Sequence, residues 1–298
     1  FVKFASAIRS AMPKAIIFAE PHVDHVRPSF NHGSSTVVSG PGYAWAPHYY
    51  DVLTLVSKGF RRWVGLDAVS HMVVLGHGRI VDAHARALRL LKNGARGLNG
   101  EAGAEATGGP TLIGEIGIPF DMGHHSSTAP YLLDSYVLSD YRVQIDAMDT
   151  SLQALERELL SFTLWNYTPD NNYCKGDGWN DEDLSIFSAS GTAIDPANLH
   201  AGGRALPAVV RPYARKVAGE PLEMRFQALT PERCFVFRFR HDARVTAPTE
   251  LFIPNYQYPD GYQVEVSDGR WTVDREAQIL VYRHTPERAE HTVRVWRV

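Results

Sequence analysis

Cysteine is scarce in this sequence of 298 residues, which contains only Cys174 and Cys234. Two cysteines cannot form the disulfide framework that stabilises many small secreted domains. Neither cysteine stands in a C-x-x-C pair or in a cysteine–histidine spacing typical of zinc sites. We therefore predict a fold held together by its hydrophobic core, with no metal site and no cofactor.

The sequence also lacks an excess of either charge. Its 30 Lys and Arg residues stand against 33 Asp and Glu residues, so the formal net charge is -3. Nucleic acids and anionic membranes attract basic surfaces, and neither is an expected partner. No apolar run reaches the roughly 18–20 residues of a membrane-spanning helix, so transient contact with a membrane surface is the most that we expect.

Several common catalytic motifs are absent, among them G-x-S-x-G, the P-loop and a GxGxxG helix entry. Esterase, kinase and dehydrogenase functions therefore lose their usual support. Aromatic residues are present at 11%, which suits a site that grips a flat, apolar-faced ligand such as a sugar.

The first part of the chain alternates between helical and strand-like patterns. Helical periodicity is ended by proline or glycine, and short continuous apolar runs are typical of strands buried on both faces. The expected order is helix 1–12, strands 15–19 and 43–50, helix 80–92, strand 111–117, helix 129–160 and strand 162–167. This alternation predicts an α/β fold with a parallel sheet, and four such strands are half of a TIM (β/α)8 barrel.

The last part of the chain has a different pattern. From Leu222 onward, short runs of alternating apolar and polar residues are separated by proline and Asp-Gly turns. Such runs are typical of an antiparallel β-sandwich. We therefore predict a partial barrel over residues 1–200 and a β-sandwich over residues 201–298.

Polar residues stand at the ends of the predicted strands, where a barrel assembles its active site. Glu115 lies between Gly114 and Gly117, which we expect to leave room for a ligand; the alternative is that it caps a loop or a helix. His48 and Tyr50 are two residues apart and share one face of a strand. They can bind a sugar hydroxyl and orient a carboxylate, or simply pack as aromatic side chains.

Three further candidates follow from the same placement. Trp165 can stack on a pyranose ring, although an isolated tryptophan is more often a core residue. Glu20, at the end of an apolar run, is a candidate general acid. The adjacent His124 and His125 point to opposite sides of an extended segment, so we do not expect them to bind a metal together.

The strand motifs resemble those of family 5 glycoside hydrolases, in particular endoglycoceramidases and the fungal β-glucosidases related to them. PTLIGEIGIPFDM is similar to the nucleophile strand of that family, WAPHYYD to its sixth strand and FTLWNYTPDN to its eighth strand. GDGWNDEDLSIFS and RPYARKVAGEP are similar to the segments that join the barrel to a C-terminal sandwich. The resemblance implies the C-terminal half of a TIM barrel, strands five to eight, followed by an antiparallel β-sandwich.

The resemblance also implies roles for the candidate residues. Glu115 is the expected catalytic nucleophile, and His48, Tyr50 and Trp165 are expected to bind substrate. The acid/base glutamate of the family belongs to an Asn-Glu-Pro motif, but here Ala19 precedes Glu20 and Pro21. We therefore expect Glu20 to be a substrate-binding residue of the fifth strand and the acid/base to lie upstream of Phe1, which would leave this chain truncated, unstable and inactive by itself.

The expected function is that of a retaining β-glycosidase, which cleaves the β-glucosidic bond of glucosylceramide or a steryl glucoside through a covalent glycosyl-enzyme. The partner is then a glycolipid with an apolar aglycone. Trp179 and Tyr173 are candidates to contact that aglycone, or they pack between the domains. An endoglycoceramidase that releases whole oligosaccharides and a non-catalytic carbohydrate- or lipid-binding protein are the alternatives.

Localisation rests on one sequon, Asn166-Tyr167-Thr168, beside the proposed site. A glycan there would obstruct catalysis. With only two cysteines, this favours a cytoplasmic protein over a secreted or vacuolar one.

Overall fold

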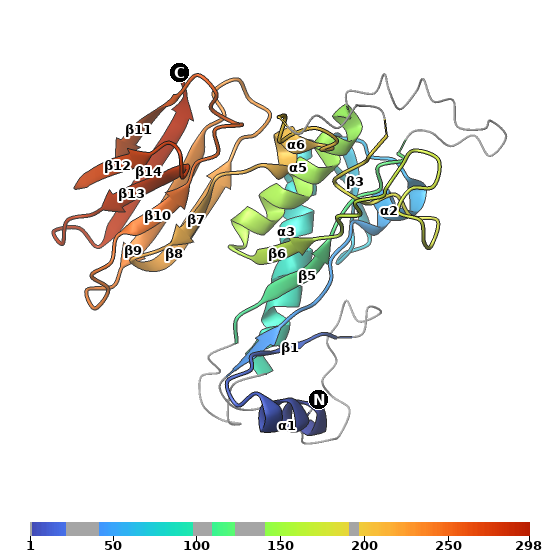
Figure 1. Ribbon diagram of the computed structural model, residues 1–298, viewed down its shortest axis with the longest axis horizontal. Helices are drawn as coiled ribbons and strands as arrows, with labels where there is room; N and C mark the ends of the chain where they lie inside the picture. The colour runs from blue at the N-terminus through green and yellow to red at the C-terminus, as the bar shows by residue number, and fades with distance from the viewer. Residues whose placement is uncertain (1, 22–41, 98–108, 123–140, 191–196) are drawn as a thin grey trace. The chain divides into compact units, whose positions relative to one another are not determined.

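The computed structural model describes residues 2–21, 42–97, 109–122, 141–190 and 197–298. These residues form two compact units (Figure 1), which are described separately. One unit comprises residues 1–139 and 160–202, and the other comprises residues 140–159 and 203–298. Within the described residues, no helix is long and apolar enough to cross a membrane.

The first unit is built on four parallel strands. They are β1 (Ile17–Ala19), β2 (Tyr43–Trp45), β5 (Leu112–Ile116) and β6 (Ser161–Leu164). β1 pairs with β2 and β5 pairs with β6, both in parallel. Parallel bridges from Trp45 to Thr111 and from His48 to Glu115 connect the two pairs. The strands therefore follow one another in chain order, as expected for an α/β sheet.

Helices and a hairpin accompany these strands. They are α1 (Val2–Ala11), α2 (Val52–Ser57), α3 (His77–Asn93), the 3-10 turn η1 (Gly94–Gly97) and the hairpin of β3 (Val64–Asp67) and β4 (Met72–Leu75). α3 buries one face through Ile80, Val81 and Leu88, in agreement with its predicted helical periodicity. The predicted α/β character is confirmed, and among the described strands the sheet does not close into a barrel.

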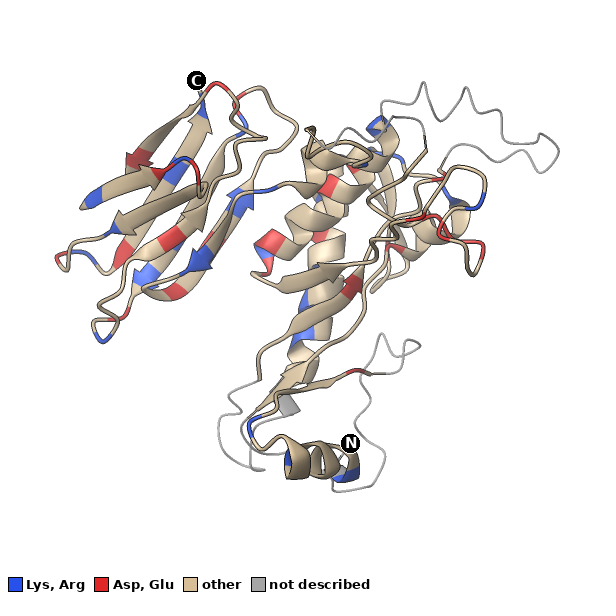
Figure 2. Cartoon of the chain, in the orientation of Figure 1, with Lys and Arg blue, Asp and Glu red and all other residues tan. Residues whose placement is uncertain are grey.

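The second unit is a sandwich of two antiparallel four-stranded sheets. Its strands are β7 (Tyr213–Lys216), β8 (Gly219–Phe226), β9 (Phe235–His241), β10 (Thr249–Phe252), β11 (Tyr262–Val266), β12 (Arg270–Asp274), β13 (Ile279–Arg283) and β14 (Glu290–Arg297). The strand orders are β12-β13-β10-β7 and β11-β14-β9-β8. Inward residues of both sheets, such as Phe237, Phe239 and Tyr282, form one fully buried core. Acidic and basic residues are interspersed over the strands (Figure 2), in keeping with the small net charge.

Two helices belong to this unit, α5 (Arg142–Arg157) and the short α6 (Leu206–Val209). The predicted helix over 129–160 is α5, and its first part lies outside the described residues. Because α5 is in the sandwich unit, that unit is made of two separate stretches of the chain. The division into 1–200 and 201–298 stays a prediction.

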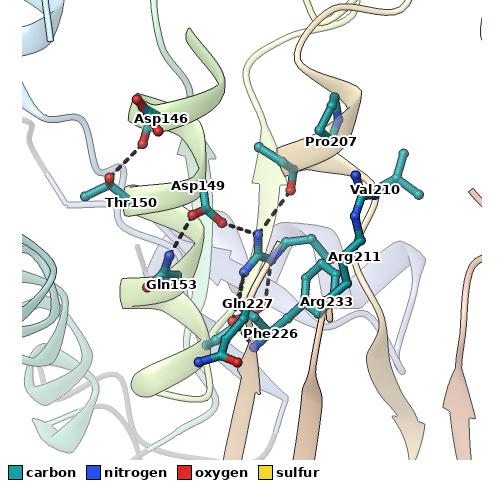
Figure 3. A network of polar contacts seen from close by, with 12 residues as sticks. Asp146, Asp149, Thr150, Gln153, Pro207, Val210, Arg211, Phe226, Gln227 and Arg233 are labelled. Atoms are coloured by element: carbon teal, nitrogen blue, oxygen red, sulfur yellow. Dashed lines mark hydrogen bonds and ion pairs between the residues drawn. The ribbon is translucent and has the colours of Figure 1, made fainter. Parts of the chain in front are cut away.

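A buried ion network joins α5 to the sandwich (Figure 3). The Arg211 guanidinium donates to both carboxylate oxygens of Glu156, at 2.6 and 3.1 Å, and to Asp149 at 2.7 Å. Burial raises the pKa of Glu156, and the Arg211 guanidinium and the Phe226 N–H offset part of that rise. Burial alone would lower the pKa of Arg211, but the carboxylates of Glu156 and Asp149 outweigh it and raise that pKa. The guanidinium therefore stays charged and fixes the helix to strand β8.

Candidate active site

The candidate residues lie at the C-terminal ends of the parallel strands. Glu20 immediately follows β1, and His48 lies just beyond β2. Glu115 is the penultimate residue of β5, and Trp165 immediately follows β6. Parallel strands bring these ends to one edge of the sheet. The structure thus brings together residues that are up to 145 positions apart, the difference between 165 and 20.

Glu115 is held by two side chains from the neighbouring strand segment. Its Oε2 accepts a hydrogen bond of 2.9 Å from the Tyr50 hydroxyl and lies 3.3 Å from Nδ1 of His48. Nε2 of His48 lies 3.3 Å from Oε1 of Glu20. The imidazole therefore stands between two carboxylates, and four of the five predicted site residues form one connected chain.

The Tyr50 hydroxyl keeps its proton in this setting. Burial, the hydrogen bond to Glu115 and the negative charge of Glu115 together raise the pKa of Tyr50 well above its ordinary value. A protonated phenol donates to the carboxylate and fixes its orientation. All the contacts described above for Glu115 go to Oε2, which leaves Oε1 for chemistry.

The glycines on either side of Glu115 have a different role from the one predicted. A Cβ at Gly117 would lie 2.1 Å from the backbone oxygen of Trp165, and one at Gly114 would lie 3.2 Å from Cδ2 of His48. The missing side chains therefore allow β6 and His48 to approach Glu115 closely. They leave room for the protein itself, whereas the sequence suggested room for a ligand.

A cavity of about 370 Å³ contains three of the predicted residues, Tyr50, Glu115 and Trp165. Its other lining residues are Leu55, Lys58, Pro119, Asp121 and the segment 180–184. Glu20 is at the margin of the network, with half of its side chain exposed. The volume falls within the range of small-molecule sites and fits a monosaccharide ring.

Sequence reasoning missed several charged residues of this cavity, among them Lys58, Asp121 and Glu182. Nε1 of Trp165 donates to Oε2 of Glu182 at 3.3 Å, which fixes the plane of the indole. Lys58 and Asp121 form an ion pair on the wall. Glu182 stands in a dense acidic run, GDGWNDEDL, which could have drawn attention to it, but Lys58 carries no comparable signal.

Buried hydrogen bonds hold the segment that carries Glu182. Asp177 accepts from the side-chain amides of Asn166, at 3.1 Å, and Asn171, at 2.8 Å. Asn171 also donates to Asp183 at 2.9 Å, and the Leu184 N–H donates to Asp177. These hydrogen bonds tie the segment that carries Glu182 to Asn166, the residue next to Trp165.

Other predicted contacts lie elsewhere. Trp179 is exposed and Tyr173 half-buried, and neither is among the residues that line the cavity. His124 and His125 lie outside the described residues. Cys174 and Cys234 are both free thiols.

Several known proteins are similar to this chain in sequence and fold. Residues 211–295 match the glycoside hydrolase family 5 C-terminal domain. The chain is 28% identical to a glucosylceramidase of Rhizopus delemar, with 95% of the chain and 41% of that protein covered, and 30% identical to a glucosylceramidase of Aspergillus fumigatus, with 91% and 42% covered.

A solved structure, the sterylglucosidase 1 of Cryptococcus neoformans, matches with a TM-score of 0.80 and 27% identity. The match covers 99% of this chain and 43% of the sterylglucosidase. The chain thus spans about two fifths of the length of each of these relatives. Residues 211–295 thus match the C-terminal domain of the family 5 glycoside hydrolases, and nearly the whole chain is similar in sequence and fold to fungal glucosylceramidases and a sterylglucosidase.

Proposed function

We propose that this chain carries the nucleophile half of a retaining β-glucosidase that acts on glycolipids, with Glu115 as the nucleophile. The observation that carries the proposal is the position of Glu115 in the cavity, oriented by Tyr50 and His48 and facing the same space as Trp165. In this proposal β1, β2, β5 and β6 are the fifth to eighth strands of a TIM barrel. The fold of the sterylglucosidase supports that assignment.

The proposed reaction has two steps. A carboxylate oxygen of Glu115 attacks the anomeric carbon, the bond from that carbon to the aglycone oxygen breaks, and an acid carboxyl group protonates the leaving oxygen. Water then attacks the glycosyl-enzyme, releases glucose and regenerates Glu115, while the same carboxyl group acts as base. In this proposal the acid/base is the glutamate of an Asn-Glu-Pro motif of the kind found in the family, and Glu20, which follows Ala19, has a substrate-binding role.

The proposed substrate combines one sugar with an apolar aglycone. Trp165 offers an aromatic face to the glucose ring. Leu55 of α2 lines the cavity, and Val52, Leu53 and Val56 of the same helix are exposed, so apolar surface continues outward from the sugar site. The names of the relatives, glucosylceramidase and sterylglucosidase, support a lipid glucoside of this kind.

The test compares the full-length gene product with its Glu115→Gln variant. We expect glucose release from glucosylceramide or a steryl glucoside, and a loss of roughly 10⁴-fold or more in the variant, because the amide cannot form the intermediate. A 2-fluoro-glucoside trap followed by mass spectrometry should label the peptide that contains Glu115. Glu276→Gln, a change at an exposed carboxyl group in the sandwich, is the matched control.

Other outcomes separate the alternatives. Release of intact lactose from lactosylceramide, without glucose release from the monoglucosides, would identify an endoglycoceramidase. Lipid-glucoside binding with neither turnover nor label would indicate a non-catalytic binding protein. Unchanged turnover in Glu115→Gln would remove Glu115 as the nucleophile.

A further inference from the structure

Three histidines meet at one end of the β-sandwich, and none of them belongs to the candidate active site. His241 ends β9, His291 lies in β14, and His284 immediately follows β13. One nitrogen from each ring lies within 4.8 Å of the other two. His291 is completely buried, and the other two are half-buried.

An aspartate fixes the orientation of the buried imidazole. Nδ1 of His291 lies 2.7 Å from Oδ2 of Asp268. That carboxylate also accepts from the Thr285 N–H and the Ser267 hydroxyl, each at 2.8 Å. With Nδ1 donating to the carboxylate of Asp268, the lone pair of Nε2 faces the other histidines.

This arrangement is that of a metal-binding histidine, whose second nitrogen donates to a carboxylate. Nε2 of His291 faces Nδ1 of His241 at 3.0 Å. Two nitrogens bound to one tetrahedral zinc ion at about 2.0–2.1 Å would lie about 3.3–3.4 Å apart, so these two nitrogens need a shift of only a few tenths of an ångström, and the ring of His284 must move inward to join them. The His284 ring centroid lies 4.5 Å from that of His291 and 4.9 Å from that of His241.

The surroundings leave a path from solvent to the three histidines. An open cavity of about 600 Å³ borders His284 and is also lined by residues 245–248. Water can reach the cluster from this cavity and supply a fourth ligand.

We propose that His241, His284 and His291 bind a divalent transition-metal ion, with zinc as the best match to three imidazole ligands. His241 and His291 belong to one sheet of the sandwich, and His284 follows a strand of the other. The ion therefore links the two sheets and stabilises the fold. No metal site was predicted from the sequence, since the three histidines are separated by 42 and 6 residues and match no zinc spacing.

The test is titration of ZnCl2 into the EDTA-treated, dialysed chain, followed by calorimetry and thermal unfolding. We expect one site that is lost in His284→Gln and at least tenfold weaker in Asp268→Asn, which leaves all three ligands in place. At a 100-fold excess over Kd, zinc should raise the Tm of the unaltered chain by about 5 °C or more. His200→Gln, a change at an exposed histidine of the other unit, should leave both quantities unchanged.

Circular dichroism of each variant distinguishes a folding defect from the loss of a metal-binding side chain. His284 is half-buried and outside a strand, so its replacement by Gln should leave the metal-free sandwich folded. Zinc binding of equal affinity in His284→Gln and His200→Gln would overturn the proposal, because the metal would then be bound elsewhere. The absence of any zinc-dependent rise in Tm in the unaltered chain would overturn it as well.

Discussion

Glu115 and Glu156 are glutamates in different units of the molecule, and donor groups of the protein orient both carboxylates. Glu156 is buried with both oxygens bound, to Arg211 and to the Phe226 N–H. The Glu115 side chain is 26% exposed, and its contacts with Tyr50 and His48 use Oε2. The comparison separates a structural carboxylate from the proposed nucleophile. Both oxygens of Glu156 accept hydrogen bonds from a cation or an amide, whereas Glu115 is oriented through one oxygen only.

The largest effect on stability should come from removing the cation of the structural site. Arg211→Met leaves Glu156 and Asp149 buried without their partner and should lower the free energy of unfolding by about 3–5 kcal/mol. Urea denaturation measures the change. Arg225→Met removes an exposed ion pair with Glu223 and should cost no more than about 1 kcal/mol. Equal effects of the two changes would mean that Glu156 does not depend on Arg211.

The geometry around Glu115 should be sensitive to a single methyl group. Gly117→Ala places its Cβ against the backbone oxygen of Trp165, so the strands must separate and Glu115 must move. Displacement of about 1 Å is enough for a loss of roughly 100-fold in kcat/KM, to be measured on a lipid glucoside. Gly78→Ala, where a Cβ meets nothing within 4 Å, is the control and should keep full activity.

Tyr50→Phe removes one hydrogen-bond donor from Glu115, the proposed nucleophile, and leaves the aromatic ring in place. A hydrogen bond to a charged group contributes about 1.5–3 kcal/mol, so kcat/KM should fall by roughly 10- to 100-fold while the fold is retained. Tyr167→Phe, a change at an exposed tyrosine, is the matched control. An unaltered kcat/KM in Tyr50→Phe would show that the hydroxyl does not position Glu115.

The smallest expected effect is on pH dependence. Burial raises the pKa of Glu156 in the folded state above its value of 4.5 in the unfolded chain, so the folded protein binds more protons and this group makes stability fall as pH rises. In Arg211→Met the pKa of Glu156 rises further, because the cation that lowers it is gone, and stability then depends more steeply on pH. The deficit of Arg211→Met should therefore shrink by about 1 kcal/mol between pH 7 and pH 5, measured by urea denaturation against the unaltered chain. A deficit that grows toward pH 5 would contradict this assignment.

Local patterns were sufficient for most of the fold. Continuous apolar runs predicted β1, β2, β5 and β6, and helical periodicity predicted α1, α3 and α5. β7 and β12 were missed because both are edge strands of their sheet, where most side chains are exposed and apolar alternation is weak. The hairpin of β3 and β4 was missed for a similar reason, since its valines and leucines are largely exposed.

The candidate site was predictable where a strand end fixes the direction of a side chain. Glu20, His48, Tyr50, Glu115 and Trp165 were found in this way, and the structure places them along one edge of the sheet. Lys58 and Glu182 were not found, because they come from a helix C-cap and a loop whose positions depend on tertiary contacts. Their roles in catalysis, like those of the predicted residues, stay predictions.

The hydrogen bond that Asn166 donates to Asp177 makes it matter whether this segment folds before or after it could be glycosylated. The nitrogen that donates this bond is the atom to which an oligosaccharide would be attached at the Asn166-Tyr167-Thr168 sequon. Asn166 is 9% exposed in the folded protein, so attachment and the native Asp177 network exclude each other. In any compartment that glycosylates nascent chains, folding of the segment from 166 to 184 would compete in time with modification. The wall of the cavity would form only where folding came first.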